Sequence, residues 1–251
     1  MSANHVVFGA GAIGRAILEE LVRRGESVRM VNLSGKMEEA PAGVEIVAAD
    51  LYDPARVKEV SRGAQVVYQA SQPNYNEWPQ KFPPLQKSIL EGLSGGNTKL
   101  VLVENLYMYD SSKTISEASP LAPLSKKGVL RLKMAEEVMS AHARGEVRTT
   151  ALRSSDYYGP GVLSSALGER VFRNLVAGKK AQISGSTTTL HSFAYIEDVG
   201  IAAAALGTHD KALGQVWIAP HTPARTQGQL VEDACRLLGV EPTMSAVSPL
   251  A

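Results

Sequence analysis

Short apolar runs alternate with amphipathic stretches along roughly the first 150 residues of the chain. The apolar runs are nearly continuous, as in VVYQA and LVLVE, which is typical of strands that are covered on both faces. The stretches between them carry apolar residues at helical spacing. This alternation predicts an α/β protein with a doubly wound parallel sheet.

The expected strands cover residues 5–9, 27–32, 44–48, 65–70, 99–104 and 149–153. The expected helices between them cover residues 13–23, 54–61, 83–93 and 125–143. Ligands of such sheets collect beyond the C-terminal ends of the strands, so the residues that follow each strand are the functional candidates.

The pattern is less regular beyond residue 160. It predicts helices at 164–177, 197–206 and 227–238, short strands at 182–184 and 215–218, and a Gly/Ser/Thr-rich loop at 185–189. We therefore expect a dinucleotide-binding Rossmann domain over residues 1–160 and a small C-terminal substrate lobe over 161–251. Part of that lobe, at about 190–215, is expected to pack back on the first domain.

The first strand leads directly into the sequence GAGAIG, with glycines at positions 9, 11 and 14. This is the G-x-G-x-x-G fingerprint, in which one glycine permits a tight turn. A second lets the backbone approach a pyrophosphate, and the third allows close packing of helix and strand. Ala12 and Ile13 then begin a helix whose free N–H groups would face the phosphates. The pattern predicts a nucleotide site at Gly9, Gly11 and Gly14, although tight glycine turns also occur without ligands.

The end of the second strand bears on the choice of nucleotide. NAD sites usually carry an acidic residue there for the ribose 2′-hydroxyl, and that charge would repel the 2′-phosphate of NADP. This chain has Asn32 at the position, followed by Ser34 and Lys36 as possible phosphate donors. The sequence favours NADP and leaves NAD open, since an asparagine can also bind a hydroxyl group.

Two further strand ends complete the expected cofactor site. Asp50 and Leu51 follow the third strand, where the adenine would lie, although Asp50 fits a turn or capping aspartate equally well. Ala70 ends the fourth strand, where the residues at strand ends are the functional candidates.

Composition narrows the class of partner. The chain is 44% hydrophobic and 20% charged, with a formal net charge of +1 and no basic cluster, which argues against a nucleic-acid surface. No run approaches the ~20 apolar residues of a membrane span, and the first residues do not resemble a signal peptide. A single cysteine, Cys235, excludes an internal disulfide framework and a Cys-based zinc site, and it fits the apolar face of a helix. We expect a cytoplasmic protein that binds a small molecule and no metal, nucleic acid or membrane.

Six segments resemble, in order, the extended or atypical short-chain dehydrogenase/reductases, the NAD(P)-dependent epimerase/dehydratase group. They are VVFGAGAIG, VEIVAADLYD, VVYQAS, LVLVENLYMYD, LRSSDYYGPG and HSFAYIEDVG. The last two match the group's R-x-x-x-x-Y-G-P-G and F-x-Y-x-x-D stretches. Together the segments span about four-fifths of the chain, and the resemblance implies a Rossmann domain with a smaller C-terminal substrate lobe.

The chain departs from this group at the catalytic positions. Members usually carry a serine after the fifth strand and a Tyr-x-x-x-Lys pair on the next helix, in which the lysine lowers the pKa of the tyrosine. The serine position falls on Asn105 here. One register of the helix places Val129 and Lys133 at the pair, and another places Lys127 and Arg131 there. Neither register offers a tyrosine, and the spacing to Glu137 favours the first.

Other tyrosines at the strand ends are the candidate replacements. Tyr107 and Tyr109 follow the fifth strand and Tyr157 follows the sixth, and Lys127 or Lys133 could lower the pKa of such a phenol. Residues 74–78 are expected to form a loop at the substrate mouth. His191 and Asp198 are interpreted as structural, at a lobe contact and a helix start respectively.

Three functions are consistent with these residues. The first is an NAD(P)-dependent oxidoreductase or epimerase of atypical type, acting on a small carbonyl or hydroxyl compound. The second is a catalytically silent NADP(H)-binding sensor or interaction module, which the missing tyrosine suggests. The third is a nucleotide-sugar epimerase or dehydratase. The group's members often pair through two helices, so a homodimer is possible.

Overall fold

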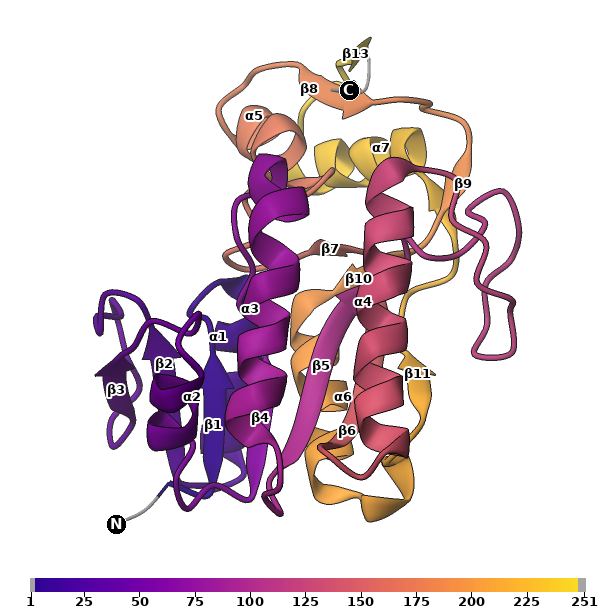
Figure 1. Cartoon of the computed structure of the whole chain (residues 1–251). Helices are drawn as coiled ribbons and strands as arrows, with labels where there is room; N and C mark the ends of the chain where they lie inside the picture. Colours follow the sequence, from indigo (N-terminus) through magenta and orange to yellow (C-terminus); the bar gives the residue numbers. More distant parts are fainter. Residues whose placement is uncertain (1–2, 248–251) are drawn as a thin grey trace. The chain divides into compact units, whose positions relative to one another are not determined.

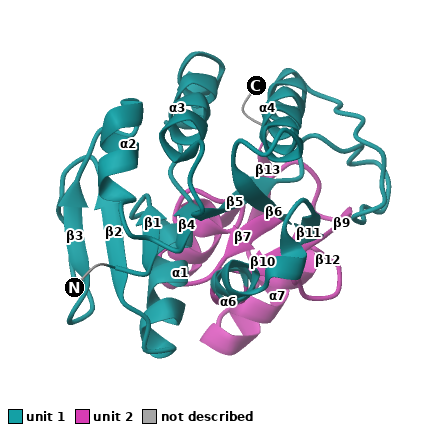
Figure 2. Cartoon of the chain, turned by 60° about the horizontal axis from the view of Figure 1, so that its bottom comes forward, with its two compact units in different colours: residues 1–154, 199–219 teal, residues 155–198, 220–251 magenta. Residues whose placement is uncertain are grey.

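The computed structural model describes residues 3–247, and the extreme ends of the two predicted domains, residues 1–2 and 248–251, lie outside that part. The chain divides into two compact units (Figure 2). Unit 1 comprises residues 1–154 and 199–219, and unit 2 comprises residues 155–198 and 220–251.

Unit 1 is built on a seven-stranded sheet in the order β11-β6-β5-β4-β1-β2-β3, in which every neighbouring pair is parallel. Its strands are β1 (His5–Phe8), β2 (Val28–Asn32), β3 (Glu45–Ala48), β4 (Val66–Gln69), β5 (Lys99–Asn105), β6 (Arg148–Ser154) and β11 (Val216–Ile218). The order reverses direction between β1 and β4. The doubly wound sheet predicted from the sequence is confirmed, and each predicted strand of this sheet agrees to within one residue at either end.

Helices cover both faces of this sheet (Figure 1). One face carries α2 (Pro54–Val60), α3 (Trp78–Leu93) and α4 (Lys126–Ala143), and the other carries α1 (Ala12–Arg23) and α6 (Ile196–Thr208), whose first three residues belong to unit 2. Two short 3-10 helices, η1 (Tyr75–Glu77) and η3 (Asp210–Ala212), complete the unit. Two of the helix starts are capped by side chains: the carboxylate of Asp53 accepts from the Ala55 amide and the Ser125 hydroxyl accepts from the Gly128 amide.

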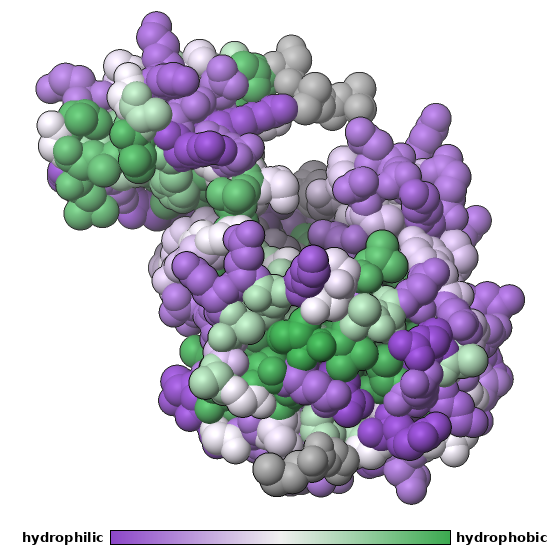
Figure 3. Space-filling view, turned by 90° about the vertical axis from the view of Figure 1, so that its left-hand side faces the viewer, coloured by the Kyte–Doolittle hydropathy of each residue, from purple (hydrophilic) through white to green (hydrophobic). Residues whose placement is uncertain are grey.

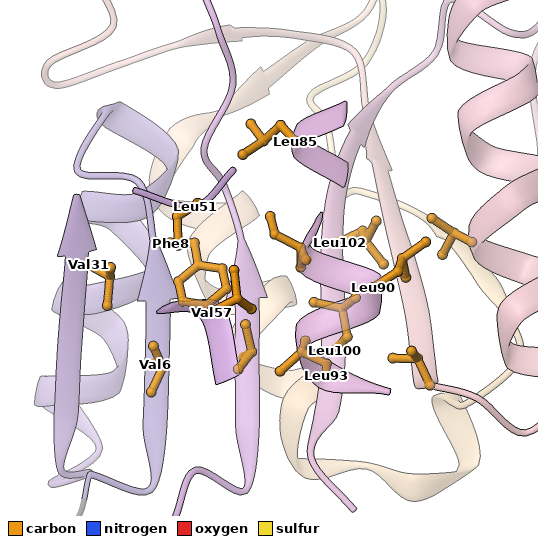
Figure 4. Packing of buried hydrophobic residues seen from close by; sticks show 14 of the residues in the cluster. Val6, Phe8, Val31, Leu51, Val57, Leu85, Leu90, Leu93, Leu100 and Leu102 are labelled. Atoms are coloured by element: carbon orange, nitrogen blue, oxygen red, sulfur yellow. The ribbon is translucent and has the colours of Figure 1, made fainter. Parts of the chain in front are cut away.

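The main core of unit 1 lies between the sheet and the helices α2, α3 and α4 (Figure 4). Val6 and Phe8 of β1 and Leu100 of β5 are fully shielded from solvent, as is Val57 of α2. Each buried side chain of this size contributes roughly 1.5–3 kcal/mol. This packing fixes the strand ends that carry the candidate site. On the face drawn in Figure 3, patches of apolar residues are bordered by polar and charged ones.

Unit 2 is made of short elements. They are β7 (Asp156–Tyr158), the π-helical η2 (Gly168–Arg173), α5 (Asn174–Val176), β8 (Ala181–Ser184), β9 (Leu190–His191), β10 (Phe193–Tyr195), β12 (Arg225–Thr226), α7 (Gln227–Leu238) and β13 (Met244–Val247). The strands form three two-stranded sheets, β10-β7, β12-β9 and β13-β8. Cys235 is buried in the core of this unit with Phe193 and Val231, as its helical spacing predicted.

Three predictions of secondary structure are wrong. The helix expected at 164–177 is reduced to η2 and α5, and it begins only at Gly168, where a Cβ would meet the Leu163 carbonyl oxygen at 2.2 Å. α3 begins five residues before residue 83, at Trp78: Pro79 stands in its first turn, where proline is tolerated, and Pro83 and Pro84 lie inside the helix. Residues 74–78 are therefore no simple loop: η1 occupies most of them, and Trp78 is buried.

Candidate functional site

The glycine turn between β1 and α1 has the geometry that a dinucleotide requires. Gly9 has φ +99°, and a Cβ there would lie 2.7 Å from the backbone of Ser71, in the segment after β4. A Cβ on Gly14 would lie 1.8 Å from the Gly9 carbonyl oxygen, so only glycine permits this approach of α1 to the turn. Around Gly11, by contrast, a Cβ would meet nothing within 4 Å. The turn is closed at its two outer glycines and open at the middle one, where a pyrophosphate would approach.

This turn lies at the point where the strand order reverses, between β1 and β4. Gly11 is the N-cap of α1 and provides no capping side chain, so Ala12 and Ile13 form the first turn of the helix with their amides available to an anion. Ala70 extends the pairing of β4 with β1, donating its N–H to the Phe8 carbonyl at 3.0 Å. The residues at hand therefore fit the diphosphate of a dinucleotide.

The segment after β2 is a tight, internally bonded turn. The Asn32 side-chain oxygen accepts from the Gly35 amide at 2.7 Å and from the Ser34 hydroxyl at 3.0 Å. Its side-chain nitrogen donates to the Lys36 carbonyl at 2.9 Å. Asn32 thus shapes the turn, and the Lys36 side chain projects from it into solvent.

Sequence reasoning missed one cation beside this turn. Arg15 follows the third glycine, and its guanidinium donates to the carbonyl of Glu38 at 2.9 Å. Arg15 and Lys36 therefore border the same turn from α1 and from the segment after β2. The position of Arg15 directly after the last glycine of G-x-G-x-x-G is the sequence feature from which it could have been predicted as a cofactor-site residue.

Asp50, after β3, is engaged in a turn: its carboxylate oxygen accepts from the Tyr52 amide at 2.9 Å. Leu51, next to it, is buried. Asp50 is therefore a turn aspartate, which is one of the two interpretations that the sequence allowed. Its carboxylate is exposed.

Four side chains gather beyond β4 and β5, and we call them the strand-end aromatic cluster: Tyr75, Trp78, Tyr107 and Lys127. The Trp78 ring centroid lies 4.9 Å from that of Tyr75 and 6.1 Å from that of Tyr107. The Lys127 ammonium lies over the Tyr75 ring, 3.1 Å from its centroid, in a cation–π contact. Two of the predicted site residues, Tyr107 and Lys127, are thereby brought together.

The start of α4 explains how Lys127 reaches this cluster. Ser125 caps the helix, and a Cβ on Gly128 would lie 2.3 Å from the Tyr107 carbonyl oxygen. Glycine at this position lets the first turn of α4 pack against the segment after β5. Asn105, at the end of β5, uses its side-chain oxygen to accept from the Tyr107 amide at 3.1 Å.

Tyr109 occupies a different environment from Tyr107. It is 2% exposed, and its hydroxyl accepts from the Arg153 guanidinium at 2.6 Å. Arg153 also binds Glu104 at 3.0 Å, and Arg131 binds the other oxygen of that carboxylate at 3.1 Å. Burial by itself lowers the pKa of Arg153, but Glu104 and the Tyr109 hydroxyl raise it by more than burial lowers it. The net shift of the pKa is therefore upward, and the guanidinium stays charged.

The burial of Arg131 bears on the two registers of α4. Arg131 is 2% exposed and lies over the Phe82 ring as well as against Glu104. Lys133 is exposed, and Val129, one turn before it, is 43% exposed. The Val129–Lys133 register therefore places both of its residues where solvent reaches them, whereas the other register places one in the core.

The remaining predicted residues lie outside unit 1. Tyr157 is in β7, paired in register with Ala194. His191, interpreted from sequence as structural, binds Asp156 of the same unit, with Nε2 2.9 Å from the carboxylate. Asp198 lies in the first turn of α6, as predicted. Within residues 3–247 no group of three or more His, Cys, Asp or Glu side chains is arranged to hold a metal, and no helix has the length and apolarity of a bilayer span.

The parallel order, the glycine turn at the reversal point and the helices on both faces define a Rossmann-type dinucleotide-binding fold. The chain belongs to the NAD dependent epimerase/dehydratase family, whose model matches residues 6–218. The resemblance drawn from the motifs is confirmed.

Solved structures of similar fold include MoeE5 in complex with UDP-glucose and NAD, with 23% identity, a TM-score of 0.82 and coverage of 98% of this chain and 85% of that one. They also include the UDP-glucuronic acid 4-epimerase of Bacillus cereus with UDP-glucuronic acid and NAD, with 20% identity, a TM-score of 0.84 and coverage of 98% and 86%. The dTDP-glucose 4,6-dehydratase of Bacillus anthracis in complex with NAD has 18% identity, a TM-score of 0.84 and coverage of 99% and 85%.

Among curated proteins, the chain is similar to 3beta-hydroxysteroid-dehydrogenase/decarboxylase isoform 2 of Arabidopsis thaliana. The two are 25% identical over 223 residues, which is 78% of this chain and 39% of that protein. The match thus spans about two-fifths of the length of that relative.

Proposed function

We propose that this chain is an NAD(P)-dependent enzyme that transfers hydride at a hydroxyl- or carbonyl-bearing carbon of a small substrate, with NADP as its preferred cofactor. The observation that carries the proposal is the glycine turn. It is closed by Gly9 and Gly14 and open at Gly11, which is the shape a bound pyrophosphate needs. The bound nicotinamide would supply the hydride acceptor or donor.

The surroundings of the turn after β2 support NADP. Asn32 leaves no carboxylate at the position where NAD sites carry one, and Arg15 and Lys36 border the turn with positive charge. Ser34 adds a hydroxyl within the turn. The structural neighbours named above contain NAD, so the cofactor preference is where this chain is expected to differ from them.

The proposed division of labour at the strand ends follows from side-chain chemistry. Asn105 donates a hydrogen bond to the substrate oxygen, because an amide can polarise a carbonyl but cannot exchange protons readily. Tyr107 is the proton-transfer group, with Tyr157 as the alternative, and Lys127 or Lys133 supplies the cation that stabilises a phenolate. Unit 2 holds the substrate.

A nucleotide-sugar epimerase or dehydratase is the second candidate. It is favoured by family membership and by the UDP-sugars in two of the neighbours. Neither register of α4 offers a tyrosine at the position of the family's tyrosine, which argues for a changed route of proton transfer in either case.

Calorimetric titration of the full chain with NADP(H) and NAD(H) tests the proposal. We expect NADP(H) to bind at least about tenfold more tightly, and Arg15→Ala to lower the affinity for NADP(H) about tenfold while leaving that for NAD(H) unchanged. Arg62→Ala, which removes an exposed cation elsewhere in unit 1, is the matched control. Equal or tighter binding of NAD(H), unaffected by Arg15→Ala, would contradict the NADP preference.

The same samples decide whether the chain is an enzyme. The nicotinamide absorbance is followed in the presence of ketones, aldehydes, free sugars and nucleotide sugars. Turnover of one class supports the proposed activity and identifies its substrate. Tight cofactor binding with no turnover across the whole panel would instead support a silent sensor.

A further inference from the structure

Unit 2 contains a pocket of its own, with a volume of ≈ 330 Å³. This lies at the lower end of the range of about 300–1,000 Å³ that is usual for small-molecule sites. Its walls come from β7, β8, β9, β10 and the start of α7, and they carry hydroxyl, amide, imidazole and carboxylate groups. Among the described residues that line it there is no lysine or arginine, and Asp156 is its only acidic residue.

The most prominent feature of this pocket is the pair formed by His191 and Asp156. The His191 Nε2 lies 2.9 Å from the carboxylate, and the side chains are 44% and 40% exposed, so both remain accessible to a ligand. The His191 ring also packs on Phe193, with ring centroids 4.5 Å apart. Because the carboxylate accepts the proton of Nε2, the neutral ring presents Nδ1 as an acceptor.

Gln227, the first residue of α7, also lines the pocket. Its side-chain nitrogen donates to the carbonyls of Ser184 and Ser186, at 3.0 and 3.3 Å. Both partners can only accept, so the orientation of the amide is fixed. The Gln227 side-chain oxygen is then buried and has no hydrogen-bond partner among the described residues. A buried acceptor of this kind is costly unless a donor from a ligand or a water molecule reaches it.

These groups select for a ligand that donates hydrogen bonds. Asp156 and His191 present accessible acceptors, and Phe193 offers an apolar ring surface beside them. Neighbouring hydroxyls on a carbon ring supply several donors and an apolar face at once. A phosphate supplies only acceptors and negative charge, and it would face the Asp156 carboxylate with no cation from the lining residues.

We propose that the pocket of unit 2 binds an uncharged, hydroxyl-rich group, such as a sugar or cyclic polyol, and that Asp156 excludes phosphorylated and nucleotide-linked compounds. This inference rests on the proposed function, for which it names the substrate class. It separates this chain from neighbours whose structures contain UDP-sugars.

The test uses the full chain without cofactor, so that its outcome does not depend on dinucleotide binding. Methyl glucoside and inositol are the neutral probes, and UDP is the charged one. Binding is measured by ligand-observed NMR and by calorimetry. We expect the neutral probes to bind in competition with one another, and UDP to bind at least about tenfold more weakly than the better of them.

Two variants localise the effect. Asp156→Asn removes the charge and keeps the shape, so UDP should bind about tenfold more tightly than to the unmodified chain. His191→Phe keeps the ring and removes the acceptor, so affinity for the neutral probes should fall at least about fivefold. Glu232→Gln, which removes an exposed carboxylate from α7, should change neither affinity.

UDP binding that equals or exceeds that of the neutral probes, and that does not respond to Asp156→Asn, would overturn the proposal. So would the absence of binding by every neutral probe to a chain whose unfolding transition is intact. If neither NADP(H) nor NAD(H) binds but the neutral probes and UDP behave as expected, the proposed function is contradicted. The proposal that the pocket of unit 2 binds a hydroxyl-rich group then still stands.

Discussion

One group of paired charged side chains in unit 1 and one in unit 2 have opposite characters. In unit 1, Glu104 is bound by Arg131 and Arg153, and all three side chains are 2–4% exposed. In unit 2, Asp156 and His191 are paired at a similar distance but are about two-fifths exposed and line a pocket. The charged groups of the first cluster bind one another and are shielded from solvent, whereas those of the second can still accept hydrogen bonds from a ligand.

The difference shows which charges serve the fold and which can serve a ligand. A buried carboxylate flanked by two guanidinium groups joins β5, β6 and α4, and ions in such a place are tolerated only while each keeps its partners. A half-exposed pair contributes little to stability, because water competes for both partners. Burial, more than the chemical type of the residues, therefore separates the two roles.

The largest effect is expected when the buried cluster is broken. Glu104→Ala leaves two buried guanidinium groups without their carboxylate, so the free energy of unfolding should fall by about 3–5 kcal/mol. Urea denaturation of the full chain measures the change. Glu146→Ala, which removes an exposed carboxylate from the Arg144 pair, is the matched control and should have little effect. A similar small effect of both substitutions would show that the cluster does not hold the strand ends.

A smaller effect is expected at the edge of the same cluster. Tyr109→Phe removes the hydroxyl that accepts from Arg153, which should lower the free energy of unfolding by about 1–2 kcal/mol. Tyr107→Phe should leave stability nearly unchanged and lower turnover about 100-fold or more. Turnover per folded molecule should fall much less in Tyr109→Phe than in Tyr107→Phe. The reverse ranking would transfer the proton-transfer role to Tyr109.

The smallest effect on the free energy of unfolding is expected from His5 and depends on pH. Burial lowers the pKa of His5 below 6.5, with Arg24 adding to the shift and Glu26 opposing it. The unfolded chain therefore takes up a proton near pH 6.5 that the folded chain refuses. The stability contributed by neutral His5 is complete above pH 6.5 and is lost as the pH falls toward the lowered value.

The slope from this one group is at most about 1.4 kcal/mol per pH unit. Denaturation between pH 7.5 and 5.5, values chosen to span roughly one unit either side of 6.5, measures it. His5→Gln should remove this component, and His191→Gln in unit 2 should retain it. An unchanged slope in His5→Gln would assign the pH dependence to other groups.

Local pattern was sufficient where the chain repeats a simple period or needs one special backbone geometry. The strands of the parallel sheet are continuous apolar runs, so their positions were predicted to within one residue. The glycines at 9, 11 and 14 were identified from their spacing after the first strand, and at Gly9 and Gly14 the backbone contacts leave no room for a side chain. In unit 2 the strands are two to four residues long, too short to show a period, and β7, β9, β10, β12 and β13 were missed.

The sequence by itself determined the fold class, the family and the position of the glycine turn, because these depend on periodicity and on local backbone limits. Only the tertiary structure decided which candidate side chains meet. It placed Lys127 on Tyr75, Tyr109 against Arg153, and Asp156 beside His191, 35 residues apart in the chain. Burial and partner are products of packing between distant segments, and no local pattern encodes them.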